Sequence, residues 1–396
     1  MTDVLFDPTR LEVQVDPYPH YRRLRDEAPV YFIEPVGAYA LTRYEDCKNT
    51  FLHPEQYSAR DFIAQAFGDL DPVPEVPSII AMDPPEHTRL RKLAAEGFKP
   101  SITRAMEPKV HEIVDGLIDD LMDRPDRSFD FVGDFAAYVP VSVTAEMIGV
   151  DASQRENFKH WTADLLNAAN RAALADDEVT RIRASVASLR EYLETVIADR
   201  RANPTDDFIS MLVRAEVDEE TLSPLEVLSV VILTHFGGSE TPSHLIGNSL
   251  IALFEEPDLM ARVKADLSLV PKVVEESLRF WSPVHLVFQT AAQEIDLHGV
   301  TIPENSFVLS YISSANRDER RFPNPDVFDI DRNTDGHLSF AHGPHYCPGA
   351  SIGRRMAAVA LTKILERMPD IARVNADTDW LPTLWIRGAR TLPVTF

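Results

Sequence analysis

Hydrophobic residues recur at helical spacing over much of the chain. Apolar side chains stand three or four positions apart between residues 110 and 121 and again between 186 and 196, which predicts two amphipathic helices. A third helix is expected to begin at Ser223-Pro224, because Ser223 can cap the first turn and Glu226 completes a capping box. This third segment is apolar on nearly all faces as far as Leu233 and beyond, which is typical of a buried helix.

Strand patterns are fewer. Residues 30–33 and 38–41 flank a turn that contains Pro35 and Gly37, which predicts a hairpin. Residues 295–302 alternate around His298-Gly299, and residues 392–396 are suited to join a small sheet late in the chain. The pattern therefore predicts a mostly α fold with a minor β portion. Because the helix patterns and the linkers do not separate into blocks, we expect a single domain over residues 1–396.

The charge and the cysteine count narrow the function. The formal net charge is −24, whereas a nucleic-acid-binding protein would show a basic domain or stripe. No apolar run approaches the about 18 residues of a membrane span, and the first ten residues lack the pattern of a signal peptide. We therefore expect a cytoplasmic protein with no membrane span. Two cysteines, Cys47 and Cys347, are too few for a disulfide framework or a multi-cysteine zinc site.

One of the two cysteines lies in a specific motif. Residues 340–349 have the spacing F-x2-G-x3-C-x-G, in which Phe340, Gly343, Cys347 and Gly349 are the fixed positions. Chance produces such a spacing in on the order of one in several thousand chains of this composition. The segment resembles the cysteine-ligand loop of the cytochrome P450 family. The alternative is a buried thiol that precedes a helix, which is the ordinary behaviour of a cysteine without a disulfide.

The resemblance implies the P450 fold, haem b as cofactor and Cys347 as the ligand of the haem iron. A thiolate ligand pushes electron density to the iron and favours cleavage of the O–O bond. Phe340 and Gly349 would then lie beside the haem, since glycine in this loop lets backbone N–H groups approach the sulfur.

A second motif precedes this loop by about 70 residues. Glu276 and Arg279 resemble the E-x-x-R pair of the family, three residues apart on one helix face. The resemblance implies a structural role, with residues 322–329 packed against the pair as the family's meander. By itself such a pair is usually a surface ion pair of small energetic value.

Several side chains are candidates to bind the haem propionates. His87 and Arg91 resemble an H-x-x-x-R pair on one helix face, and His345 matches a further family position of this kind. A solvated basic helix face is the alternative for the first pair. Gln289 stands where many bacterial relatives carry a propionate-binding arginine. Because Gln donates a hydrogen bond but carries no charge, we expect weaker neutralisation there, with Gln289 or His285 compensating.

The long apolar helix contains residues that suit neither helix nor core. Gly237, Gly238, Glu240 and Thr241 interrupt it, and glycine costs roughly 1 kcal/mol inside a helix, so we expect a functional reason. The segment resembles the oxygen-binding helix of the P450 family. The resemblance implies that the glycines line the haem, Thr241 donates a hydrogen bond during oxygen activation and Glu240 relays protons. Pro242 removes the N–H that would bond to the Gly238 carbonyl, so we expect a water there, with an incidental kink as the alternative.

The substrate pocket follows from the resemblance position by position. Its expected members are mostly apolar, as pocket linings generally are, and each has core packing as the alternative. They are Phe62, Phe67, Leu233, Thr234, Phe236, Val284, His285, Leu286, Val287, Trp385 and Ile386. Thr234 and His285 are the candidates to orient a polar group. The expected substrate is a hydrophobic natural product, terpenoid, steroid, macrolide or acyl chain.

The reaction expected from the resemblance inserts one oxygen atom from O2 into a C–H or C=C bond. No flavin or ferredoxin domain is attached, so we expect a separate ferredoxin or flavodoxin, supplied by NAD(P)H, to bring electrons to a monomeric enzyme. Arg89, Lys92, Arg354 and Arg355 are candidates for a basic docking patch, with ordinary solvated charges as the alternative. A peroxide-driven peroxygenase and a non-catalytic haem sensor are the competing functions.

Overall fold

The structure is a computed structural model that describes residues 5–169, 171 and 174–396. Helices hold 57% of the residues and strands 11%, so the predicted mostly α fold with a minor β portion is confirmed. Contacts divide the chain into two compact units. Unit 1 comprises Met1–Ser58, Val114–Tyr138 and Thr241–Phe396, and unit 2 comprises Ala59–Ile113 and Val139–Glu240. The single-domain assignment remains a prediction.

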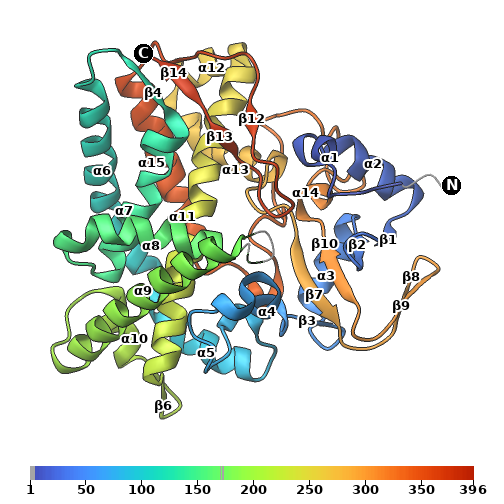
Figure 1. The fold of residues 1–396 in the computed structure, drawn as a ribbon. Helices are drawn as coiled ribbons and strands as arrows, with labels where there is room; N and C mark the ends of the chain where they lie inside the picture. The colour runs from blue at the N-terminus through green and yellow to red at the C-terminus, as the bar shows by residue number, and fades with distance from the viewer. Residues whose placement is uncertain (1–4, 170, 172–173) are drawn as a thin grey trace. The chain divides into compact units, whose positions relative to one another are not determined.

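Unit 1 contains most of the strands and the helices of both chain ends. Its helices are α1 (Leu11–Val15), α2 (Tyr18–Glu27), α3 (Tyr44–Leu52), α12 (Pro257–Ala265), α13 (Val270–Phe280), α14 (Ile312–Ala315) and α15 (Ala350–Arg367) (Figure 1). Its strands are β1 (Val30–Ile33), β2 (Ala38–Leu41), β3 (Tyr57–Ser58), β4 (Ser128–Asp130), β7 (Val287–Ala291), β8 (Ile295–Leu297), β9 (Val300–Ile302), β10 (Phe307–Ser310), β11 (Ala372–Arg373), β12 (Asp379–Trp380), β13 (Ala389–Thr391) and β14 (Pro393–Thr395).

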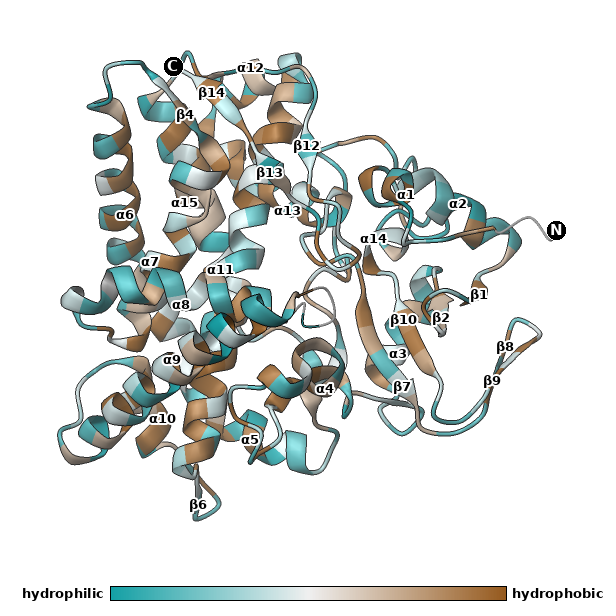
Figure 2. Ribbon diagram, viewed as in Figure 1, coloured by the Kyte–Doolittle hydropathy of each residue, from teal (hydrophilic) through white to brown (hydrophobic). Residues whose placement is uncertain are grey.

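The main sheet of unit 1 has five strands in the order β1-β2-β10-β7-β3. The predicted hairpin is confirmed as β1 and β2, antiparallel with Val30 opposite Leu41. β10 runs parallel to β2 and antiparallel to β7. β7 and β10 are largely hydrophobic (Figure 2). The alternating residues 295–302 form a second hairpin, β8–β9, and the late strand β14 pairs with β11 and β4.

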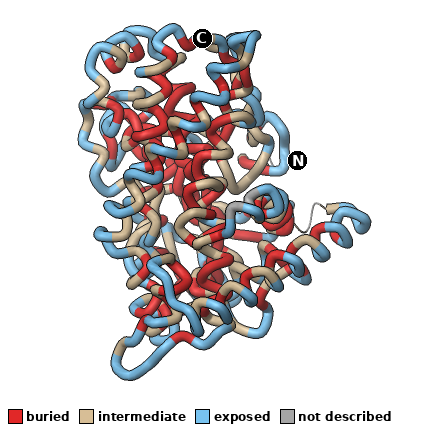
Figure 3. The backbone as a smooth tube through the Cα atoms, turned by 90° about the vertical axis from the view of Figure 1, so that its left-hand side faces the viewer, coloured by how far each residue is buried: buried red, intermediate tan, exposed pale blue. Residues whose placement is uncertain are grey.

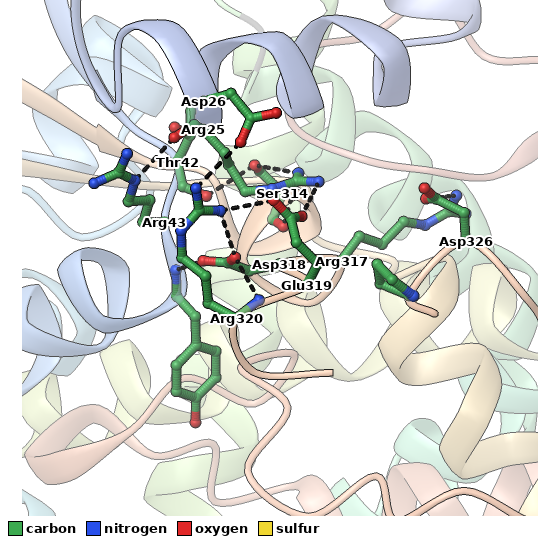
Figure 4. A network of polar contacts seen from close by, with 12 residues as sticks. Arg25, Asp26, Thr42, Arg43, Ser314, Arg317, Asp318, Glu319, Arg320 and Asp326 are labelled. Carbon is green, nitrogen blue, oxygen red and sulfur yellow. Dashed lines mark hydrogen bonds and ion pairs between the residues drawn. The ribbon is translucent and has the colours of Figure 1, made fainter. Parts of the chain in front are cut away.

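A polar network ties α2 to the segment after β10 within unit 1 (Figure 4). The guanidinium of Arg25, 1% exposed, donates to the carbonyl and hydroxyl of Ser314 and lies 3.2 Å from the Glu319 carboxylate. Asp318 accepts from the Tyr44 backbone N–H at 2.9 Å, at the start of α3. A buried cation needs such partners because its desolvation is costly. The network therefore ties α2 and the start of α3 to the segment of residues 314–319.

Unit 2 is helical apart from one short hairpin, β5 (Glu216–Val217) with β6 (Glu220–Thr221). Its helices are α4 (Phe62–Phe67), α5 (Glu86–Ala94), α8 (Arg155–Ala168), α9 (Asp176–Ala202) and α10 (Phe208–Arg214), with most of α7 (Tyr138–Ile148). The predicted amphipathic helix over residues 186–196 is part of α9, whose buried face is apolar. In both units the buried residues follow helices and strands, while many connecting turns are exposed (Figure 3).

Two long helices run through both units, α6 (Pro100–Met122) and α11 (Pro224–Glu255). The predicted capping box of α11 is confirmed, since the backbone N–H of Ser223 donates to the Glu226 carboxylate at 2.8 Å and the Glu226 N–H donates to the Ser223 hydroxyl at 3.2 Å. One helical stretch, Phe131–Ile148, is long and apolar enough to cross a membrane, but 56% of it is buried inside the protein. Such burial is typical of a core helix.

Candidate haem site

The two cysteines have different surroundings. Cys47 is fully buried in α3, its Sγ lies 3.2 Å from the Leu41 carbonyl, and burial raises the pKa of its thiol well above the ordinary value. Cys347 is only partly buried and stands three residues before α15. The positive end of the helix dipole favours a negatively charged group at such a position. Cys47 is therefore a packed core residue, and Cys347 is the thiol with the surroundings of a ligand.

The loop around Cys347 is closed by a backbone hydrogen bond and contains a glycine that its position requires. The Cys347 N–H donates to the Phe340 carbonyl at 2.9 Å, which closes the loop. Gly343 has a φ of +63°, and a Cβ there would lie 2.7 Å from the Phe51 carbonyl oxygen of α3. A Cβ on Gly349 would lie 3.9 Å from the Cys347 sulfur. Gly343 is therefore required by its φ and by the close approach of α3, whereas a Cβ on Gly349 would make only an ordinary contact with the sulfur.

The ring of Phe340 is held by a charged clamp. The Arg354 guanidinium lies over this ring, 4.3 Å from its centroid, and donates to the Glu275 carboxylate at 2.5 and 3.2 Å. The His337 ring is 5.9 Å from the Phe340 ring and lies 3.3 Å from the same carboxylate. Glu275 therefore orients both neighbours of the aromatic residue that begins the Cys347 loop.

The pair Glu276 and Arg279 lies in the core of unit 1, with both side chains 0% exposed. Arg279 donates to both carboxylate oxygens of Glu276, at 2.6 and 2.8 Å, and to the carbonyls of Asn316 and Pro325. Arg332 lies 3.0 Å from Glu276. Because every charge has a close partner, the cluster locks the segment of residues 322–329 onto α13.

In unit 2, His87 and Arg91 stand four residues apart on α5. His87 is 2% exposed and Arg91 is partly buried. The segment before α5 is fixed by Asp83, which accepts from the Ala59 N–H at 3.0 Å and lies 3.3 Å from Arg60. This face of unit 2 offers one imidazole and one guanidinium from the same helix side.

The interrupted segment of α11 stays helical through Pro242. Gly237 is exposed, and Glu240 and Thr241 are partly buried. The Gly238 carbonyl, which Pro242 leaves without an N–H, has the Thr144 hydroxyl of α7 at 3.3 Å. The same hydroxyl lies 2.6 Å from the Pro140 carbonyl, and a Cβ on Gly238 would lie 3.4 Å from it. Because this hydroxyl has one proton and the Pro140 carbonyl is the nearer acceptor, the water that we expect at the Gly238 carbonyl stays a prediction.

Comparison with known proteins connects these features to a family. The model of the family described as Cytochrome P450 matches residues 20–368. Cytochrome P450 107B1 of Saccharopolyspora erythraea is 37% identical over 396 residues, which cover 96% of this chain and 95% of that protein. The chain belongs to the cytochrome P450 family.

Solved structures of P450 proteins have the same fold. Cytochrome P450 CYP109Q5 from Chondromyces apiculatus is 36% identical and superimposes with a TM-score of 0.90 over 98% of this chain and 97% of that chain. P450BioI, solved in complex with an acyl carrier protein ligated to hexadec-9Z-enoic acid, is 31% identical with a TM-score of 0.87 over 97% of this chain and 99% of that chain. Membership of this family implies haem, iron protoporphyrin IX, as the cofactor.

Each unit, taken by itself, holds donors whose chemistry suits haem. Unit 1 presents the Cys347 thiol beside the Gly349 backbone, with the partly buried His345 in the same loop. Unit 2 presents His87 and Arg91, which have the chemistry to donate to propionate carboxylates. In the residues that the structure describes, no cluster of three His, Cys, Asp or Glu side chains gathers as a metal site. The family's prosthetic group needs only one thiolate from the chain.

The predicted pocket residues fall into two groups, one in each unit. In unit 2, the rings of Phe67 and Phe236 meet at a centroid distance of 5.4 Å, and Leu233 packs against the same core, while Phe62 is partly buried. The Thr234 hydroxyl donates to the Val230 carbonyl at 2.7 Å, so only its lone pairs remain to orient a substrate.

In unit 1, the segment after α13 meets the C-terminal turn. Val284 and Ile386 form an isolated antiparallel bridge, and the backbone N–H of His285 donates to the Trp385 carbonyl at 2.7 Å. Val284, Val287, Trp385 and Ile386 are partly buried, whereas Leu286 is 3% exposed and is a core residue. The structure therefore joins two segments about 100 residues apart that sequence reasoning had assigned to one pocket.

Two predicted site residues point into the core of unit 1. The His285 ring lies 3.3 Å from the Tyr21 hydroxyl of α2, and burial lowers its pKa well below the ordinary value. The Gln289 amide donates to the Thr50 carbonyl at 2.8 Å, and its oxygen accepts from Ser310 at 3.3 Å. The Gln289 amide and the His285 ring thus have partners inside unit 1, and the expectation that one of them compensates at a propionate, like the substrate role of the His285 ring, stays a prediction.

Two of the four cations of the expected docking patch form ion pairs, and Arg355 is exposed. Arg89 forms ion pairs with Glu226 and Glu220, and Arg354 is held by Glu275. Lys92 is exposed on α5. Sequence reasoning also missed Glu275, although its position beside Glu276 was a signal. Consecutive helix residues point about 100° apart, so Glu275 does not share the side of α13 that holds the Glu276–Arg279 pair. Its carboxylate contacts Arg354 and His337, which flank the Phe340 ring.

Proposed function

We propose that this P450 is a haem-thiolate monooxygenase that inserts one oxygen atom from O2 into a hydrophobic small molecule. The observation that carries the proposal is the Cys347 loop, in which a partly buried thiol stands three residues before α15 and the backbone N–H of Cys347 closes the loop on the Phe340 carbonyl. The overall reaction consumes O2, two electrons and two protons and yields the hydroxylated or epoxidised product and water. We further propose a cytoplasmic, monomeric protein.

Each residue has a distinct task in this proposal. Cys347 binds the iron as a thiolate, and His87, Arg91 and His345 donate to the propionates. Thiolate-ligated haem supplies the activation of O2. Thr241 would hold a proton at its hydroxyl for the activation of O2, and Glu240 would pass protons from solvent to it. Both lie on α11 next to two glycines, whose small size leaves room for a ligand close to the helix.

The substrate class follows from the lining. Leu233, Phe236, Val284 and Ile386 are partly buried and apolar, which favours a steroid, terpenoid, macrolide or acyl chain over a charged molecule. The complex of P450BioI with an acyl-loaded carrier protein makes an acyl chain one member of the screening panel. We propose that a separate ferredoxin or flavodoxin brings the electrons, although the pairing of Arg89 and Arg354 leaves fewer cations than expected to steer it.

The first experiment is the absorption spectrum of the dithionite-reduced protein under carbon monoxide. A Soret band shifted strongly to the red is the expected result for thiolate ligation. Cys347→Ser should abolish this band, whereas Cys47→Ser is the matched control that retains it, because Cys47 is buried in α3. A band at the position of histidine-ligated haem in the native protein would refute the proposal.

A second assay separates the alternatives. The monooxygenase consumes NADPH with a surrogate reductase–ferredoxin pair and needs Glu240 and Thr241. A peroxygenase turns over with hydrogen peroxide alone, and Thr241→Ala would leave that activity intact because peroxide already carries the protons. A haem sensor would do neither.

A further inference from the structure

A buried histidine on α11 links this helix to α8. The His235 side chain is 0% exposed, and its Nε2 lies 2.8 Å from the hydroxyl of Thr162, which is 3% exposed. The imidazole also packs on the Phe158 ring, with the ring centroids 4.1 Å apart. A fully buried imidazole is costly unless its polar atoms have partners. Thr162 and Phe158 are both residues of α8.

The hydrogen bonds define the state of the ring. The Thr162 hydroxyl donates its single proton to the Phe158 carbonyl at 2.6 Å, so it accepts from His235, whose proton is on Nε2. Burial lowers the pKa of His235 to about 3, so the ring is neutral over the physiological pH range. The remaining nitrogen, Nδ1, faces the Ser239 hydroxyl at 3.5 Å. His235 is therefore a neutral donor directed at one position on α8.

The residues on either side of His235 belong to the proposed pocket. Phe236 meets the Phe67 ring of α4, and Thr234 is partly buried. Three consecutive residues of α11 thus face the pocket lining, α8 and α4. The contact between α8 and α11 therefore lies within one helical turn of the residues that would contact a substrate.

The other attachments of α8 are to α9. Asp164 accepts from Arg181 at 2.5 Å, and the Trp161 ring lies 5.4 Å from the Tyr192 ring. These contacts hold α8 and α9 together as a pair. Among the polar contacts described for α8, the bond from His235 to Thr162 is the one that fixes the pair on α11.

We propose that His235 is a positioning residue that anchors α8 to α11 through Thr162 and thereby sets the size of substrate that the site admits. The effect on substrate size rests on the proposed monooxygenase function, whereas the contact between His235 and Thr162 does not. His235→Leu leaves no buried donor without a partner, because the Thr162 proton remains on the Phe158 carbonyl. Thr162→Val is different, since it strands the His235 N–H in the core. His235→Gln retains a donor that can reach Thr162.

Hydrogen exchange of the haem-loaded protein tests the anchor without any substrate. We expect the amides of α8 to exchange about tenfold faster in His235→Leu and at least as fast in Thr162→Val. His235→Gln should stay within about twofold of the native rate, with α10 as the internal reference. Arg181→Gln is the matched control that loosens α8 from α9 instead. Native exchange of α8 in both His235→Leu and Thr162→Val would overturn the proposal.

Azole titrations test the consequence for substrate size. Imidazole, 1-phenylimidazole and a biphenylimidazole bind haem iron through nitrogen and differ in bulk. We expect the ratio of Kd values for the largest and smallest azole to change about fivefold in His235→Leu and Thr162→Val. The ratio should be native in His235→Gln. Faster exchange with an unchanged ratio would overturn the size-setting role. If the native protein lacked the red-shifted CO band, the monooxygenase proposal would fail while the exchange result would still decide the anchor.

Discussion

Glu275 is the residue whose replacement most directly tests how the Cys347 loop is held. Its carboxylate accepts from Arg354, which lies over the Phe340 ring, and from His337 on the other side. Burial raises the pKa of Glu275, but the hydrogen bonds from His337 and Arg354 outweigh burial and lower it from 4.5 to about 2. Glu275→Gln retains the shape of the side chain and removes its charge.

The expected loss follows from this pKa. The difference between 4.5 and about 2 corresponds to about 3 kcal/mol of preferential stabilisation of the charged form. The side chains of Glu275 and Arg354 are 31% and 33% exposed, so solvent screening reduces the contribution. We therefore expect Glu275→Gln to lower the free energy of unfolding by about 1–2 kcal/mol and to speed the loss of the red-shifted CO band in mild denaturant.

The pH dependence gives an independent check. Since the folded-state pKa lies below the unfolded-state value, the stabilisation by Glu275 is fully present above about pH 4.5 and is lost as the pH falls toward 2. Denaturant titrations between pH 7 and pH 3.5 should therefore show a shallower decline for Glu275→Gln than for the native protein. The control is Arg262→Gln, which breaks an ion pair with Asp331 whose side chains are 48% and 51% exposed. Equal stability and equal slopes for native protein and Glu275→Gln would refute the clamp.

Three further substitutions test other parts of the site by chemical unfolding and CO spectra. Gly343→Ala should lower the free energy of unfolding by about 2 kcal/mol or more, because the φ is +63° and the new Cβ would meet the backbone of α3. Gly299→Ala, with a φ of +79° and open space around the new Cβ, should lower it by about 1 kcal/mol. Equal losses in the two variants would contradict the steric argument. Arg279→Leu should cost about 3–5 kcal/mol and prevent haem loading, since it leaves the buried Glu276 short of its closest partner; a stable, haem-loaded variant would contradict this. Thr144→Val should cost about 0.5–1.5 kcal/mol by removing the hydroxyl that faces the α11 carbonyl, and unchanged stability would show that the carbonyl has another partner.

Patterns that depend on neighbours in sequence were read correctly. The start of α11 at Pro224, its capping box and the β1–β2 hairpin involve residues at most about a dozen positions apart, so the chain itself carries the geometry. The order of the main sheet, β1-β2-β10-β7-β3, joins residues more than 200 positions apart and has no local signature. The resemblance to a family supplied that part, because propensity and periodicity alone do not specify long-range pairing.

The surroundings of two candidate site residues could not be predicted from the sequence, for one physical reason. Gln289 and His285 were placed by alignment to backbone positions, and their backbones do lie in the expected strand and segment. The direction of a polar side chain depends on which donors and acceptors surround it. In this chain the Thr50 carbonyl and the Tyr21 hydroxyl capture the two side chains. Alignment transfers a position, and hydrogen bonding then decides the role.

Polar groups of α11 also find their hydrogen-bond partners on neighbouring helices. Thr144 and Thr162, on two other helices, each provide a hydroxyl for α11, one at the Gly238 carbonyl and one at the His235 ring. A helix interrupted by glycines and a proline loses internal hydrogen bonds and packing, so its neighbours must supply the polar partners that fix its place. The glycines and the proline of α11 therefore lie close to its contacts with α7 and α8, and substitutions on those helices should alter the proposed site without touching a ligand.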